Sequence, residues 1–280
     1  MEIFTLWLWP LIALIVLPGL LVYFGLHVVQ RGIIFVDLAL AQIAALGVCV
    51  AVALGAHPGH DVLPFVLSVV FTLLGAALFA WTRFRHPRVP QESIIGIIYV
   101  VAAAAATLVL SHSAEGDEAI KSLLVGNLLL VSKGEVLRTI ALFGAIALVH
   151  VTLRKRFMML TFDEEGANRR GIAIRTWDFV FYATFGLTVT SFVQIMGVYL
   201  VFSYLIVPAV CGALLSANIR SRLIIGWLVA LAAGISGLVL SVRLESLDLP
   251  TGPTIVCCFG ALLIVCAILM RLRSGRGAAA

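Results

Sequence analysis

Charged side chains are scarce in this sequence: only 12% of its 280 residues are Asp, Glu, Lys or Arg, against about 25% in an ordinary soluble domain. Hydrophobic residues make up 62%, and the mean hydropathy is +1.14. The chain therefore lacks the polar surface that would cover a water-soluble globule, and lipid must form part of its solvent. Because the apolar runs continue to the end, we expect one membrane domain, residues 1–280.

The sequence also lacks the short motifs of common catalytic chemistry. It has no HExxH, no GxSxG and no GxxxxGK[ST] phosphate loop, which argues against a membrane zinc protease, a serine hydrolase and an ATP-binding chain. Its five cysteines lie in apolar runs without CxxC spacing and indicate small buried side chains. We therefore expect no enzyme and no permanently bound cofactor, and any coupling to ATP must come from a partner chain.

What the sequence has instead is a series of long apolar runs. A helix needs about 20 such residues to cross a bilayer, which predicts an all-α, polytopic transmembrane bundle. The two runs between Trp177 and Ser216 have almost no loop between them and could pack as one span plus a re-entrant piece, so eight spans are an alternative to nine. The nine expected spans are Trp7–Val29, Ile33–Gly55, Val62–Trp81, Ile94–Leu110, Val136–Leu153, Trp177–Gln194, Gly197–Ser216, Leu223–Val242 and Thr254–Met270.

The basic residues predict how the bundle is oriented. Alternate loops hold 15 of the 19 Lys and Arg residues, and the other set holds only Lys121, Lys133, Arg138 and Arg243. Basic loops stay in the cytoplasm, so we expect a cytoplasmic C-terminus and an external N-terminus in a multi-pass protein of the inner membrane. Positive charge in short clusters between apolar runs is an orientation signal, and we expect no nucleic-acid partner.

Polar residues inside spans are functional candidates, because each costs free energy in lipid. Asp37 lies about one helical turn beyond Gly32. There it either stabilises the helix start through the dipole or faces a translocation path. Gln42 lies deeper and requires a partner for its amide, which is either pore water and cargo or another helix. Pro208 interrupts a later span, either as an ordinary kink or as a break that lines a pathway.

Two loops carry further candidates. The external loop with His57, His60 and Asp61 offers two imidazoles and one carboxylate, which suit zinc or a similar metal. A turn with incidental histidines is the alternative. The cytoplasmic segment Arg154–Thr176 has acidic residues first and basic residues later, the order that a helix dipole favours. It predicts a short cytoplasmic helix displayed to a partner, or else a solvated connecting loop.

Five stretches resemble the permease family of ABC importers for zinc, manganese and iron. They occur in that family's order along the chain. The stretches are Gly32–Gly47, Glu92–Tyr99, Leu124–Val131 with Gly197–Ala209, Asp248–Ile255 and the cytoplasmic Phe162–Ile172.

The resemblance implies a type II ABC importer-like bundle that acts as the permease subunit and imports a divalent metal ion. It implies a homodimer or paired permease, a cytoplasmic ABC ATPase and a periplasmic or lipid-anchored metal-binding protein. Within the matched stretches it implies that Asp163, Ala167 and Gly171 contact the ATPase. The translocation path would include Gln42, Asp37, Ser203 and Pro208.

One departure from the family pattern concerns the second span. Relatives place a carboxylate and an imidazole one helical turn apart there, and the aligned residues here are Leu38 and Gln42. Neither is a good ligand for zinc. The alternative function is an ATPase-independent secondary metal transporter or channel, which predicts more charged residues at mid-membrane than this chain contains.

Overall fold

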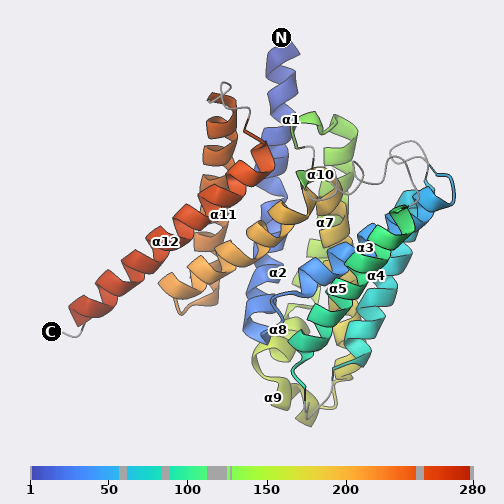
Figure 1. Ribbon diagram of the computed structural model, residues 1–280. Helices are drawn as coiled ribbons and strands as arrows, with labels where there is room; N and C mark the ends of the chain where they lie inside the picture. Colours follow the sequence, from blue (N-terminus) through green and yellow to red (C-terminus); the bar gives the residue numbers. More distant parts are fainter. Residues whose placement is uncertain are drawn as a thin grey trace. The chain divides into compact units, whose positions relative to one another are not determined.

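Helices account for all the regular structure in the part of the chain that the structure describes. The structure is a computed structural model that describes residues 2–56, 62–83, 89–111, 125–126, 128–243 and 249–277. Figure 1 shows the helices in order: α1 (Glu2–Val16), α2 (Pro18–Arg31), α3 (Val36–Ala53), α4 (Leu63–Trp81), α5 (Gln91–Leu110), η1 (Leu128–Leu130), α7 (Lys133–Thr152), α8 (Arg154–Phe162), α9 (Glu164–Arg169), α10 (Ile174–Leu215), α11 (Ile219–Arg243) and α12 (Thr251–Gly277). The expected all-α bundle is confirmed.

The chain divides into two compact units, each built from separated parts of the sequence. The first unit combines Met1–Val29, Val125–Ala141 and Ile195–Ala280. The second unit combines Gln30–Leu124 and Leu142–Gln194. The chain therefore passes from one unit to the other within α2, α7 and α10.

In the second unit, α3 packs against α4 and α5. Gly47 permits the close approach of α3 and α4, because a Cβ there would lie 2.6 Å from the carbonyl oxygen of Leu67. Small residues at such positions bring membrane helices together. A hydrogen bond of 2.9 Å between the buried hydroxyls of Thr72 and Thr190 joins α4 to the first half of α10. Thus α3 and its neighbours form a tightly packed helical core.

In the first unit, α11 packs against α12 and α1. The indole of Trp227 donates a hydrogen bond of 3.3 Å to the carbonyl of Ile15. Tyr204 and Phe259 pack edge to face with ring centroids 4.8 Å apart, and both side chains are fully buried. Aromatic pairs of this geometry add to the packing free energy, so they help to hold α10 against α12.

The long helix α10 decides how the spans are counted. The described residues contain eight helices that are long and apolar enough to cross a bilayer, and the 42-residue α10 is one of them. The count is eight when α10 is taken as one helix and nine when its two halves are counted separately. The expected spans Trp177–Gln194 and Gly197–Ser216 are both helical within α10, with no loop between them. They meet at Gly197, whose φ of 77° and ψ of 166° interrupt the helical geometry.

Candidate functional site

The short helix α9 is closed at its first turn by a side chain. The Asp163 carboxylate accepts a hydrogen bond of 2.9 Å from the backbone N–H of Gly166, which satisfies one of the free donors at a helix start. Glu164 and Glu165 occupy the first turn and Arg169 the last, in agreement with the helix dipole. The charge order in the sequence therefore correctly predicted a short helix in this segment, with acidic residues in its first turn and a basic residue in its last.

The end of α9 is closed by backbone hydrogen bonds. The N–H of Gly171 donates to the carbonyl of Asn168 at 3.0 Å, and the N–H of Ile172 donates to the carbonyl of Ala167 at 3.1 Å. Together with a φ of 69° at Gly171, these bonds form a Schellman motif. Ala167 is fully buried. The short helix expected within Arg154–Thr176 is confirmed as α9, Glu164–Arg169, and the alternative of a connecting loop is wrong.

A buried carboxylate lies at the centre of an ionic cluster near the start of α10. Asp178 is fully buried. One of its oxygens is 2.9 Å from Nη1 of Arg31, and the other is 2.5 Å from Nη1 of Arg83. Arg31 also stacks over the ring of Phe181, with 4.1 Å to the centroid. Two guanidinium groups on one carboxylate compensate its burial.

Each arginine of this cluster has a second partner on the cytoplasmic segment. Nε of Arg31 donates a hydrogen bond of 3.0 Å to the hydroxyl of Thr161 in α8. Nη2 of Arg83 forms an ion pair of 2.7 Å with Glu164 in α9. Burial by itself lowers the pKa of Arg83, but the charges of Asp178, Tyr182 and Glu164 outweigh it and raise the pKa. Arg83 therefore stays charged and bridges α9 to α10.

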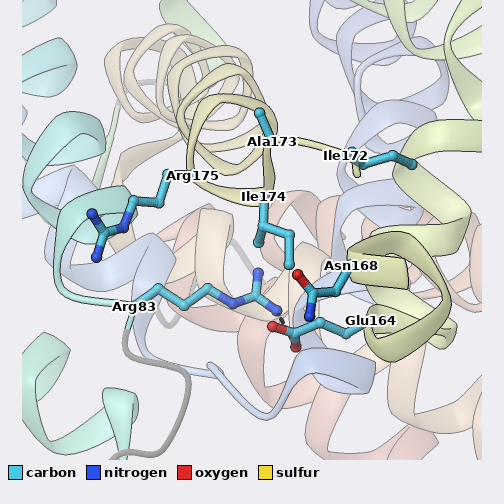
Figure 2. Close-up of a pocket in the computed structure, with 7 residues that line it drawn as sticks. All are labelled: Arg83, Glu164, Asn168, Ile172, Ala173, Ile174 and Arg175. Carbon is cyan, nitrogen blue, oxygen red and sulfur yellow. Dashed lines mark hydrogen bonds and ion pairs between the residues drawn. The ribbon is translucent and has the colours of Figure 1, made fainter. Parts of the chain in front are cut away.

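Beside α9 and the start of α10 lies a pocket of about 460 Å³. Figure 2 shows the Arg83 guanidinium directed at Glu164 across this pocket, with Asn168 next to the carboxylate. Arg175 is exposed on the rim and has no ion pair within the described part of the chain. The pocket is lined by Arg83, Glu164, Asn168, Ile172, Ala173, Ile174 and Arg175, so its polar walls come from residues of both signs.

The two candidates on α3 differ in their surroundings. Asp37 is 1% exposed, and neither carboxylate oxygen has a hydrogen-bond partner among the described residues. Gln42 is half-buried and forms a stripe with the half-buried Leu38 and Leu46 at intervals of four residues. On a helix, five positions separate Asp37 and Gln42 by about 140°. They share a helix but not a face.

The other candidates for a path lie on the second half of α10, in the first unit. Ser203 is buried, and its hydroxyl donates to the carbonyl of Tyr199 at 2.9 Å. Pro208 is also buried and lies inside α10. The non-helical backbone occurs at Gly197, not at Pro208. The break that the sequence suggested at Pro208 is therefore displaced to the glycine.

The external candidates His57, His60 and Asp61 lie outside the described residues. Among the residues that the structure describes, no group of three or more His, Cys, Asp or Glu side chains has the arrangement of a metal site. The metal hypothesis for His57, His60 and Asp61 thus stays a prediction.

Comparison with known proteins gives one family match over nearly the whole chain: residues 4–270 match the ABC 3 transport family. The chelated iron transport system membrane protein YfeD of Yersinia pestis is 26% identical over 69% of this chain and 64% of its own length. The manganese transport system membrane protein MntC of Halalkalibacterium halodurans is 24% identical over 83% of this chain and 76% of its own length.

A solved structure shares the fold. A chain of PsaBC from Streptococcus pneumoniae, determined in complex with a Fab, superposes with a TM-score of 0.76 at 21% identity. The match covers 94% of each chain. At this identity the likeness shows the fold alone.

Proposed function

Because this chain belongs to the ABC 3 transport family, we propose that it is the permease subunit of an ABC importer for a divalent metal ion, namely manganese, iron or zinc. Two of its relatives carry the names of manganese and chelated-iron transport proteins. The membrane-spanning helices are the body of such a permease. The metal is cargo on this view, and it passes through the chain without a resident cofactor.

Helix α9 is the observation that carries the dependence on a partner ATPase. Its two ends are closed by Asp163 and by the turn at Gly171, so it is a preformed helix, which supports a role as a contact element. The basic residues around it lie in the loops that orientation signals assign to the cytoplasm. Asp163, Ala167 and Gly171 are the residues that we assign to the contact with the ATPase.

We assign the translocation path to the least covered polar side of α3. The half-buried Gln42 offers an amide without a partner in the described part of the chain, and an unpaired amide in an apolar medium costs on the order of a few kcal/mol. Water or a hydrated cation would satisfy it. We also propose Asp37, which lies on another face of α3, and Ser203 and Pro208 of α10 as path residues. His57, His60 and Asp61 would receive the metal outside.

The proposed assembly places two permease copies, or a pair of related permeases, in the inner membrane. It adds a cytoplasmic ATPase pair and an external metal-binding protein. The low content of acidic and basic residues inside the spans supports this arrangement, because a carrier that binds and releases ions alone needs charged groups at mid-membrane. A permease that is opened and closed by ATP hydrolysis needs fewer of them.

The proposal is tested with the complex of permease, ATPase and binding protein in proteoliposomes. ATP hydrolysis is measured with manganese, iron(II) or zinc, and radioactive metal uptake is measured in parallel. We expect at least one of the three metals to stimulate hydrolysis and to accumulate only when ATP is present. Metal uptake at the same rate without ATP would contradict the proposal and favour a secondary transporter.

A further inference from the structure

The ionic cluster around Asp178 joins three elements that the sequence separates. Arg31 is the last residue of α2, Arg83 follows α4, and Asp178 lies in the first turns of α10. Both oxygens of Asp178 are occupied, by Nη1 of Arg31 at 2.9 Å and by Nη1 of Arg83 at 2.5 Å. The described part of the chain offers no other ion pairs to this carboxylate, so the two arginines fix its position.

Each arginine also reaches the cytoplasmic segment with a different nitrogen. Arg31 binds the hydroxyl of Thr161 in α8, and Arg83 binds the carboxylate of Glu164 in α9. A guanidinium is planar and has five N–H donors, so one arginine bridges two oxygen acceptors in a fixed geometry. Helices α8 and α9 are thereby connected to α10 through two parallel bridges of the same design.

From these contacts we propose that Arg83 is a positioning residue that transmits a displacement of α9 to α10 through Asp178, and that Arg31 holds Asp178 to α8. The inference rests on the proposed function, in which the ATPase moves α9. The buried pairs with Asp178 are durable, because removing one partner of a buried ion pair leaves an uncompensated charge and costs several kcal/mol in typical proteins. The Arg83–Asp178 pair therefore persists while α9 moves.

The two ends of the Arg83 bridge differ in exposure, and this difference makes the link adjustable. The Asp178 side chain is 0% exposed, whereas that of Glu164 is 49% exposed. A half-exposed ion pair is weak and is screened by salt. Glu164 is therefore the end at which the contact forms and breaks, beside a pocket of about 460 Å³ that leaves room for a shifted carboxylate.

The first test changes Glu164 and compares it with its neighbour. Glu164→Gln removes the charge from the Arg83 contact, and Glu165→Gln makes the same change one position along α9, where the structure describes no ion pair. We expect Glu164→Gln to lower the ratio of metal imported to ATP hydrolysed by about twofold to fivefold, the range of one half-exposed ion pair. Glu165→Gln should keep the wild-type ratio.

The second test asks whether Arg83 and Glu164 act as one unit. Arg83→Lys keeps a positive charge for Asp178 but lacks the second nitrogen that reaches Glu164. If the link is real, Arg83→Lys together with Glu164→Gln lowers the ratio no further than either change alone. Independent effects that multiply would overturn the proposal, as would a Glu164→Gln variant with the wild-type ratio.

A third variant separates failure of the link from failure of the proposed function. Gly171→Val strains the positive φ that closes α9, so it disturbs the ATPase contact without touching the ionic cluster. If Gly171→Val uncouples hydrolysis from transport and Glu164→Gln does not, only the link is refuted. If neither variant uncouples them, α9 is not the contact element. Unfolding temperatures of all variants are measured to exclude a merely structural effect.

Discussion

At the scale of single residues, Gln42 is a polar side chain in a membrane helix that makes no hydrogen bond within the described residues. It is half-buried in α3, between Leu38 and Leu46 on the same stripe. Amides in an apolar medium acquire a partner or cost free energy. The stripe is therefore where cargo, water or a second copy of the chain would be expected to meet α3.

We expect Gln42→Leu to slow metal uptake by about tenfold, which corresponds to one lost polar contact of about 1.4 kcal/mol in the rate-limiting step. Gln42→His should slow it as well, for a different reason: an imidazole binds the ion and delays its release. Uptake is measured in cells at matched amounts of protein in the membrane. A Gln42→Leu variant that transports at the wild-type rate would show that the amide serves packing alone.

Residues of the candidate site were predictable where the neighbouring sequence was sufficient to identify them. Asp163 was singled out by the charge order of its segment and Gly171 by the family resemblance, and both residues close α9. Asp178 did not stand out, because its two partners lie about 95 and 147 positions away. Arg31 and Arg83 were interpreted only as orientation signals, since a sequence does not show which basic residues meet a buried carboxylate.

At the scale of helices, the distance between two packed helices depends on whether a glycine of one helix faces the backbone of the other. A Cβ at Gly47 in α3 would lie 2.6 Å from the Leu67 carbonyl oxygen, whereas a Cβ at Gly144 in α7 would meet nothing within 4 Å. Both glycines are inside long helices, where glycine itself is unfavourable relative to alanine. The same substitution therefore has opposite consequences at the two sites.

We expect Gly47→Ala to destabilise the protein by about 1–3 kcal/mol, because the clash is with backbone and α3 must shift away from α4. Gly144→Ala should be neutral or stabilise it by up to about 1 kcal/mol through helix propensity. Thermal unfolding of the two purified variants in one detergent measures both. Equal shifts in the unfolding temperature would show that Gly47 does not set the distance between α3 and α4.

Helix positions were largely predictable, since an apolar run of membrane length has few other solutions. The least predictable feature was the connection inside α10. The two expected runs lie in one 42-residue helix that is interrupted at Gly197, where the backbone leaves helical geometry. Hydropathy reports how apolar a run is, not whether its backbone turns, so the conformation at Gly197 was not available from the sequence.

At the scale of the whole molecule, the basic residues predict on which side of the membrane the two ends of α10 lie, which helix length alone does not. Arg175 lies at its start, and Arg220 and Arg222 follow its end. Since basic loops remain in the cytoplasm, we expect both ends of α10 on the same side. Its two halves should then cross the membrane separately, in agreement with the nine spans expected from the sequence.

Reporter fusions test this arrangement. Fusions after Arg175 and after Asn218 should both report the cytoplasm, and a fusion after Asp117 should report the exterior, as the distribution of basic residues requires. The Asp117 fusion is the control that the reporter distinguishes the two sides. An external signal after Asn218 would mean that α10 crosses once, and the nine-crossing arrangement would then be wrong.

Gly126 illustrates a different consequence of close packing. Its φ is 71°, and a Cβ there would overlap the main chain of Met196 and Gly197, which itself has a φ of 77°. Because the obstructing atoms are backbone, no exchange of neighbouring side chains relieves the overlap. A side chain at position 126 therefore has no compensating exchange among its neighbours, and we expect members of the family to keep glycine there.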